Sequence, residues 1–379
     1  MCKRRSGSIW RGCEGGGCVE QDLFVEFDPS FPLADIQKIV DRLAFGGIFA
    51  SHVSFRRDPR AFQNLIHLIL VDGFEVIALP DRNLSSRMAD VARNGVSSNR
   101  DVPTQLAADF MALCQCLNIT IEPSISFHEF ASTEGNQAAI DELGWFRAAD
   151  HDQAPAWVDL AMGRANLIEV QEMQSVAEVN LVRNLDRWRA NYAVALEIAE
   201  VELSGGKSLN KFMSVLDWMS EEFFLAGPAL MFAAMYFGPQ SRRSGMLKKL
   251  RSENRVMALN GIRNAAWDIT HLSDFVERIG RQETKKAYLF GTADKALSSI
   301  AEMLITDSEP GLELTWVAGK LSDFWLASEA FKISSAILKA RTEAVEESTK
   351  SKRKVSQTEL GRIIEGGEAH IANFITWVR

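Results

Sequence analysis

Cysteine is scarce in this sequence, with five residues among 379. Three of them lie in the first 18 residues, and Cys114 and Cys116 lie in an apolar segment, so the regular spacing of a disulfide framework is missing. A zinc site near Cys13 and Cys18 would need two further ligands, and none is evident nearby. This distribution favours a reducing compartment, and we expect a cytoplasmic protein.

Long apolar runs are also missing. The most apolar stretch, residues 223–238, is shorter than the ~20 residues of a membrane-spanning helix, and Pro228 interrupts it. The basic start of the chain is not followed by the apolar segment of a secretory signal. We therefore expect no membrane segment, and we interpret residues 223–238 as a buried helix.

An excess of positive charge is the third missing feature, because the formal net charge is −8. This value disfavours a protein that coats nucleic acid with a basic surface. It is compatible with an enzyme that holds a few phosphates locally and carries acidic metal ligands.

Apolar residues make up 46% of the chain and charged residues 24%, which is typical of a globular protein with a real core. Short, mostly apolar runs at 74–79, 118–121 and 287–290 predict buried strands. Each is followed by a loop and a segment with helical spacing. Strands that alternate with helices indicate a helix-rich α/β fold around a small parallel sheet.

Segment composition predicts the organisation of the chain. Residues 1–22 are rich in Gly, Arg and Cys and predict a disordered tail. We expect an α/β domain over residues 23–305, with a helical insertion at about 155–255. A C-terminal helical extension is expected over residues 306–379.

Two of the predicted strands lead directly to an aspartate, Asp81 after the first and Asp294 after the last. Ligands of parallel α/β sheets bind beyond the carboxyl ends of the strands, so parallel strands would bring both carboxylates to one edge. The alternative for each aspartate is a helix N-cap, a common position for this residue type.

Two further acids, Glu129 and Asp268, lie in predicted helices among apolar neighbours. A carboxylate in such surroundings is costly to bury unless it is paired or bound to a metal. Asp268 could instead pair with Arg263 or Arg278. Glu122 competes with Glu129, since seven residues separate the two and one helix would carry both on nearly the same face.

Four carboxylates at one site repel each other, and a divalent cation relieves that repulsion. Hard oxygen ligands suit Mg²⁺ or Mn²⁺. Such an ion can activate water and neutralise the charge that develops on a phosphodiester.

The order of these residues resembles the PIN-domain nucleases. It comprises an Asp-x-Asn at residues 81–83, a Glu in an early helix, an Asp in a late helix and a Thr-x-Asp at residues 292–294. The resemblance covers residues 72–305 and implies a parallel sheet whose acids bind Mg²⁺ or Mn²⁺ and hydrolyse RNA. It implies that the metal-site acids are Asp81, Glu129, Asp268 and Asp294, with Asn83 and Thr292 as their polar companions. Small PIN domains have no counterpart of the helical insertion.

Substrate phosphates need cations, and Arg82 and Arg87 follow Asp81 closely enough to contact them. The basic residues between 242 and 255 are a second source of phosphate contacts, or else a solvated face. We therefore expect a metal-dependent ribonuclease, similar to toxin or defence effectors and subject to a protein regulator. The alternatives are a non-catalytic helical interaction protein and a DNA-directed nuclease with the same metal site.

Overall fold

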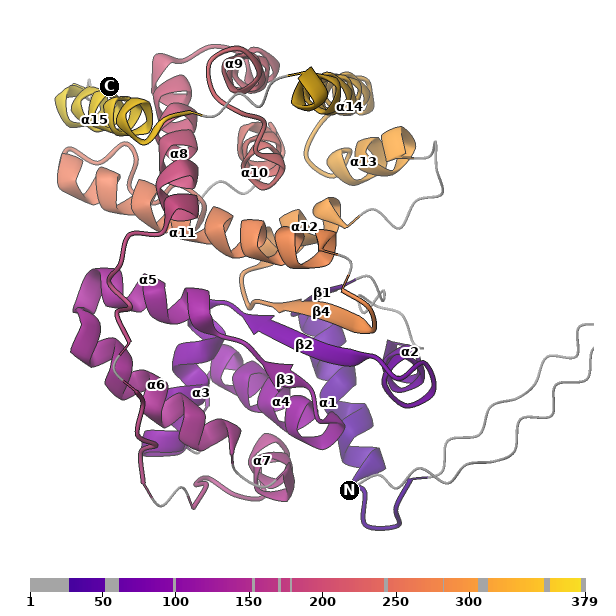
Figure 1. Cartoon of the computed structure of the whole chain (residues 1–379). Helices are drawn as coiled ribbons and strands as arrows, with labels where there is room; N and C mark the ends of the chain where they lie inside the picture. The colour runs from indigo at the N-terminus through magenta and orange to yellow at the C-terminus, as the bar shows by residue number, and fades with distance from the viewer. Residues whose placement is uncertain are drawn as a thin grey trace, which may run out of the picture.

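The computed structural model describes residues 27–51, 61–97, 100–151, 154–169, 172–177, 179–241, 245–281, 283–305, 313–350 and 355–375. The predicted disordered tail, with its three cysteines, lies outside these ranges. Helices dominate the described chain, and one small sheet lies between two groups of helices (Figure 1).

The sheet has four strands in the order β1-β4-β2-β3. Their bounds are Phe49–Ser51 for β1, Glu75–Pro80 for β2, Thr120–Ile121 for β3 and Lys286–Gly291 for β4. The three strands predicted from the sequence are confirmed, and β2 pairs in parallel with both β3 and β4. The expectation of a wholly parallel sheet was wrong, because β1 adds to β4 in the antiparallel direction. A three-residue strand such as β1 is too short to produce a detectable sequence pattern.

Both faces of the sheet are buried, which explains why its strands are continuous apolar runs. In β2, Val76 and Ala78 enter one hydrophobic core, whereas Ile77 and Leu79 enter the other. Strand β4 divides its side chains between the two cores in the same alternating way. This alternation follows from the two-residue period of a strand.

The first core lies between the sheet and the N-terminal helices, below the sheet in Figure 1. These helices are α1 (Leu33–Gly46), α2 (Ala61–Ile66), the π-helical turn η1 (His67–Val71), α3 (Arg82–Asn94), α4 (Val102–Leu117), α5 (Ser124–Glu134), α6 (Asn136–Asp150) and α7 (Ala154–Ala161). Helices α3 and α5 begin just after β2 and β3, so their N-terminal ends lie at the carboxyl edge of the sheet.

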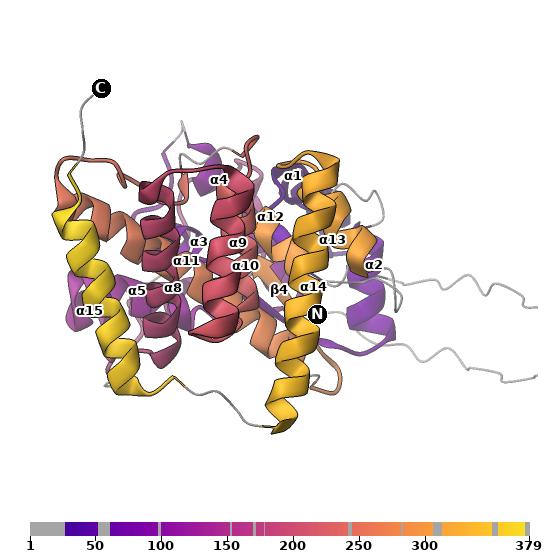
Figure 2. The ribbon, with the colours of Figure 1, turned by 90° about the horizontal axis from the view of Figure 1, so that it is seen from above.

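The second core lies on the opposite face of the sheet. Its helices are α8 (Asp186–Ser204), α9 (Ser208–Glu221), α10 (Gly227–Phe237), α11 (Arg255–Gly280), α12 (Lys295–Leu304), α13 (Glu313–Leu321), α14 (Ala327–Lys350) and α15 (Gln357–Asn373). Helices α11 and α12 lie next to the sheet (Figure 1), and α15, α8, α9 and α14 stand side by side in an outer layer (Figure 2).

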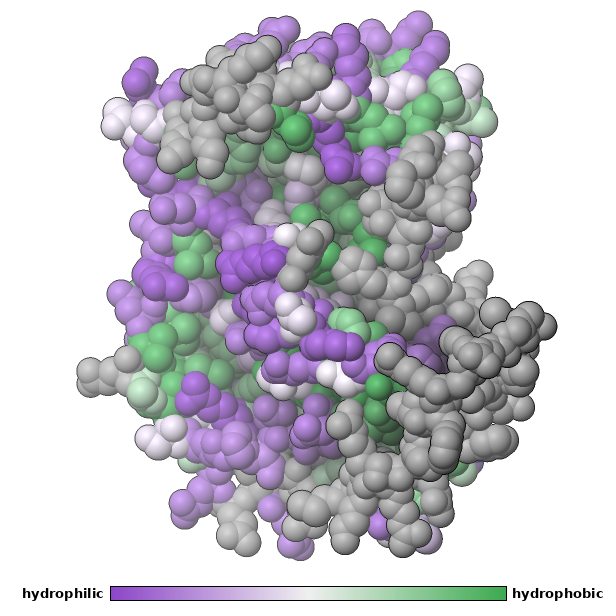
Figure 3. All heavy atoms as spheres, turned by 45° about the vertical axis from the view of Figure 1, so that its right-hand side comes forward, coloured by the Kyte–Doolittle hydropathy of each residue, from purple (hydrophilic) through white to green (hydrophobic). Residues whose placement is uncertain are grey.

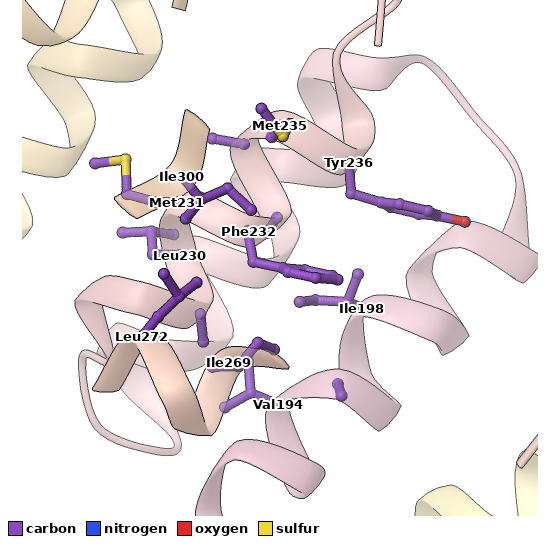
Figure 4. Close-up of a cluster of buried hydrophobic side chains, with 14 of the residues drawn as sticks. Val194, Ile198, Leu230, Met231, Phe232, Met235, Tyr236, Ile269, Leu272 and Ile300 are labelled. Carbon is purple, nitrogen blue, oxygen red and sulfur yellow. The ribbon is translucent and has the colours of Figure 1, made fainter. Parts of the chain in front are cut away.

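Helix α10 is the buried helix expected from residues 223–238, since its residues 229–237 are all buried. Figure 4 shows Phe232 and Leu230 of α10 among side chains of α8, α11 and α12. Within the described ranges, no helix is long and apolar enough to span a bilayer. On the face shown in Figure 3, hydrophobic residues form separate patches among hydrophilic ones, the usual arrangement at a protein surface.

Helices α7–α10 occupy much of the segment predicted as helical at residues 155–255, but the described residues between 162 and 185 form turns and loops. Helices α13–α15 lie within residues 306–379. Helices α8–α10 and α13–α15 share one hydrophobic core with α11, α12 and one face of the sheet. Both predicted segments therefore contribute side chains to the same core as the helices beside the sheet.

Candidate functional site

The carboxyl ends of β2 and β4 bring Asp81 and Thr292 together. Pro80 and Gly291 are paired at the end of the parallel ladder, and the backbone N–H of Asp81 donates to the carbonyl oxygen of Gly291 at 2.8 Å. The Thr292 hydroxyl donates to Oδ2 of Asp81 at 2.5 Å. Both residues are almost completely buried, with exposed fractions of 3% for Asp81 and 1% for Thr292.

The same threonine links Asp81 to Asp294. Oγ1 of Thr292 accepts the backbone N–H of Asp294 at 3.0 Å. Oδ1 of Asp294 accepts the N–H groups of Ala296 and Leu297 and caps α12, whereas Oδ1 of Asp81 accepts the N–H of Leu84 and caps α3. Both aspartates therefore cap helices, as the alternative interpretation expected, and both lie at the edge of the sheet where the site was predicted.

Helices α5 and α11 bring two more acids to this edge. Helix α11 rests on the sheet, with the rings of Phe275 and Phe290 5.5 Å apart. His271 of α11 meets Glu129 of α5, with Nε2 3.1 Å from Oε2. Asp268 precedes His271 by three residues, which places both on one side of α11. The contact of His271 with Glu129 joins residues that are 142 positions apart in the sequence, so it could not be predicted locally.

The charges of these acids act on one another. Burial raises the pKa of Asp81, the hydrogen bonds from Thr292 and Leu84 oppose that rise, and the charge of Glu129 adds to it. Burial also raises the pKa of Asp268 well above its usual value, and the charges of Glu129, Asp294 and Asp81 raise it further. The four acids proposed from the sequence therefore lie within electrostatic range of one another.

Within the described ranges, basic side chains do not pair with the two strand-end aspartates or with Asp268. Arg263 and Arg278, the partners considered for Asp268, pair instead with Glu368 and Asp274. In the part of the chain that the structure describes, no arginine or lysine forms an ion pair with Asp81, Asp268 or Asp294. Nearby cations still influence them, because the charges of His271 and Lys248 lower the pKa of Asp81 and of Asp268, respectively.

Glu122 and Asn83 occupy other environments. The backbone N–H of Glu122 donates to Ala78 at 2.8 Å, and its side chain accepts the N–H of Ser124 at the start of α5. Asn83 is exposed in the first turn of α3, and its carbonyl oxygen accepts the hydroxyl of Ser86. The side chain of Glu122 therefore supports the start of α5, whereas Glu129, within that helix, contacts His271.

The two arginines predicted to contact phosphate are held by other residues. Arg82 pairs with Glu142 of α6, where Nη2 lies 3.0 Å from Oε2, and its guanidinium stacks 3.9 Å above the ring of Phe130. Arg87 donates to Thr104 at 2.8 Å and pairs with an acid at the start of α4. These contacts connect α3 to α6 and α4, and they involve none of the four acids.

The basic segment before α11 is also divided among different contacts. Arg251 pairs with Glu202 at 2.9 Å, and Arg255 donates to the carbonyl oxygens of three other residues. Arg242 and Arg243 lie outside the described residues. Lys248 is the residue of this segment whose charge acts on Asp268.

Carboxylate oxygens are suitable ligands for Mg²⁺ or Mn²⁺. Over the described ranges, however, no three His, Cys, Asp or Glu side chains are grouped closely enough to hold an ion as they stand. Side-chain rotations would be needed to bring several of these oxygens to one ion.

Comparisons of the chain with protein-family models, with curated proteins and with solved structures give no match. The functional interpretation therefore depends on the residues of this site and their contacts.

Proposed function

We propose that this protein is a metal-dependent nuclease that hydrolyses phosphodiester bonds, with RNA as its substrate. The observation that supports the proposal is the convergence of Asp81, Glu129, Asp268 and Asp294 from four separate segments at the carboxyl edge of the sheet. Partly buried carboxylates that repel one another are costly, and a divalent cation would remove that cost.

The chain would contribute the ligands and fix their positions. A bound Mg²⁺ or Mn²⁺ would supply the positive charge that activates water and neutralises the phosphodiester in the transition state. Thr292 contacts Asp81 and the backbone of Asp294, and so limits the movement of both acids. His271 orients Glu129 through their hydrogen bond, in the way that outer contacts commonly orient metal ligands.

The choice of RNA follows from the resemblance of the ordered acidic motifs to PIN-domain nucleases. A toxin or defence effector under the control of a protein regulator belongs to the same proposal and has the same basis. The proposed cytoplasmic location rests instead on the scarce, irregularly spaced cysteines. A DNA-directed nuclease would use the same acids, so the substrate has to be tested directly.

The experiment compares cleavage of labelled single-stranded RNA by the purified protein in Mn²⁺ and in EDTA. We expect the protein to cleave the RNA in Mn²⁺ and not in EDTA. The cleavage rate should fall about a hundredfold or more in Asp81→Asn and in Asp294→Asn. Asn caps helices as well as Asp does, so both variants should fold. Asp101→Asn is the matched control, because Asp101 caps α4 through the N–H of Thr104 but is exposed.

Full activity in both site variants, or cleavage that persists in EDTA, would refute the proposed acids. An absence of cleavage by the unmodified protein on RNA and on single- and double-stranded DNA, with no effect of Mn²⁺ on thermal stability, would favour the interaction-protein alternative. Cleavage of DNA in preference to RNA would correct the substrate and retain the metal site.

A further inference from the structure

The turn before α11 rests on that helix at a glycine. A Cβ atom at Gly261 would lie 1.8 Å from the carbonyl oxygen of Lys248 and 2.8 Å from its carbonyl carbon. Atoms of real side chains do not approach so closely, so this contact between turn and helix requires glycine. The backbone of Lys248 is therefore held directly against α11.

Helix geometry relates this contact to the acids. Asp268 follows Gly261 by seven residues, which is two helical turns, or about 10 Å along the axis, on nearly the same side of α11. The side chain of Lys248 is exposed, and its charge acts on Asp268. The Gly261 contact thus places the base of the flexible four-carbon stem of Lys248 about two helical turns from Asp268.

The turn itself has a defined shape. Met246, Leu247 and Leu250 are buried in the second core, with exposed fractions of 3%, 6% and 4%. Lys249 adopts a φ of 59°, a left-handed conformation that is uncommon for residues other than glycine and is kept only when its surroundings impose it. These anchors hold the backbone of Lys248 in place while its side chain stays in solvent.

Lys248 is available for a ligand. Among the residues that the structure describes, none forms an ion pair with Lys248, whereas Arg251 of the same turn pairs with Glu202. A lysine that lies near a group of carboxylates, and has no ion-pair partner among the described residues, can contact a phosphate held at those carboxylates by a metal ion.

We propose that Lys248 binds a backbone phosphate of the nucleic-acid substrate at the edge of the acidic site. The identity of the substrate rests on the nuclease proposed above, but the phosphate contact is a property of Lys248 and can be measured separately. Lysine is a common phosphate-binding residue and acts as a compact point charge.

The test measures binding of a fluorescent single-stranded RNA of about 12 nucleotides in Ca²⁺ with all four acids intact, because Ca²⁺ takes the same oxygen ligands as Mg²⁺ at longer distances. Gel electrophoresis checks that the RNA stays uncleaved under these conditions. We expect Lys248→Met to weaken binding about tenfold, the loss of one charge-assisted contact. The slope of log Kd against log salt should fall by about 0.7, because one phosphate contact is lost. Lys332→Met, an exposed charge on α14, is the matched control and should bind normally.

Cleavage by Lys248→Met is measured in parallel in Mn²⁺, where kcat/KM should also fall about tenfold. Equal binding and equal salt slopes for Lys248→Met and Lys332→Met would overturn the phosphate contact, even if the protein cleaves RNA. Binding that depends on Lys248 in a protein that cleaves nothing would support the contact and refute the nuclease. A protein that neither binds nor cleaves RNA or DNA would overturn both.

Discussion

Replacing Gly261 with alanine tests the packing of the turn on α11 without touching a charged residue. The added Cβ would lie 1.8 Å from the carbonyl oxygen of Lys248, whereas ordinary contacts begin at 3.4 Å. The opposing atom belongs to the backbone, so a side-chain rotation cannot relieve the overlap. The turn must move away from α11, or the helix must bend.

The magnitude follows from two opposing effects. Alanine in a helix is favoured over glycine by about 1 kcal/mol. Overpacking of this kind costs about 3 kcal/mol, the upper end of the usual range, because the clash is with backbone. We therefore expect Gly261→Ala to lower the free energy of unfolding by about 2 kcal/mol.

Gly366→Ala is the matched control. Gly366 lies inside α15, where a Cβ would meet no atom within 4 Å, so this variant should gain about 0.5–1 kcal/mol. Chemical denaturation followed by circular dichroism compares both variants with the unmodified protein. A Gly261→Ala variant as stable as Gly366→Ala would refute the contact on which the position of Lys248 depends.

Two further predictions concern buried acids. Burial raises the pKa values of Asp81 and Asp268 in the folded protein above the ordinary aspartate value of 3.8. In the metal-free protein, the stabilisation that these two protonated carboxyls provide is therefore complete below about pH 3.8, and it is lost as the pH rises through their folded-state pKa values. Because protons compete with the cation, Mn²⁺ should raise the melting temperature more at pH 8 than at pH 5, and equal shifts would contradict a site at these acids. Asp109, fully buried, accepts from Arg42 at 2.6 and 2.8 Å. Asp109→Asn should therefore destabilise the protein by about 3 kcal/mol in chemical denaturation, against less than about 1 kcal/mol for the exposed Asp101→Asn.

The sheet edge could be predicted because its signals are local. The apolar run at 74–79 is offset by one residue from β2, Glu75–Pro80. The run at 287–290 is one residue shorter at each end than β4, Lys286–Gly291. The strand-end rule then placed Asp81 correctly beside the last strand, since parallel neighbours end at the same edge.

The contacts of the surrounding residues could not be predicted in the same way. Arg82 lies next to Asp81 in the sequence, yet its partner is Glu142, sixty residues away on another helix. His271 contacts Glu129, and the charge of Lys248 acts on Asp268, because α11 packs on the sheet and the turn before α11 packs on that helix. Such positions depend on the packing of whole helices, and neighbouring residues in the sequence do not determine them.

The helix-cap and metal-ligand interpretations of the strand-end aspartates do not exclude each other. Asp81 and Asp294 each accept the capping N–H groups at Oδ1, and only Asp81 uses Oδ2 for Thr292 among the hydrogen bonds of the described residues. A cap needs an oxygen acceptor, whereas cation binding needs the negative charge, and asparagine provides only the first. If capping were the whole role of Asp294, Asp294→Asn would leave both the fold and any response to Mn²⁺ unchanged. If the carboxylate holds a cation, the same variant keeps α12 intact and loses the stabilisation by Mn²⁺, so one substitution separates the two roles.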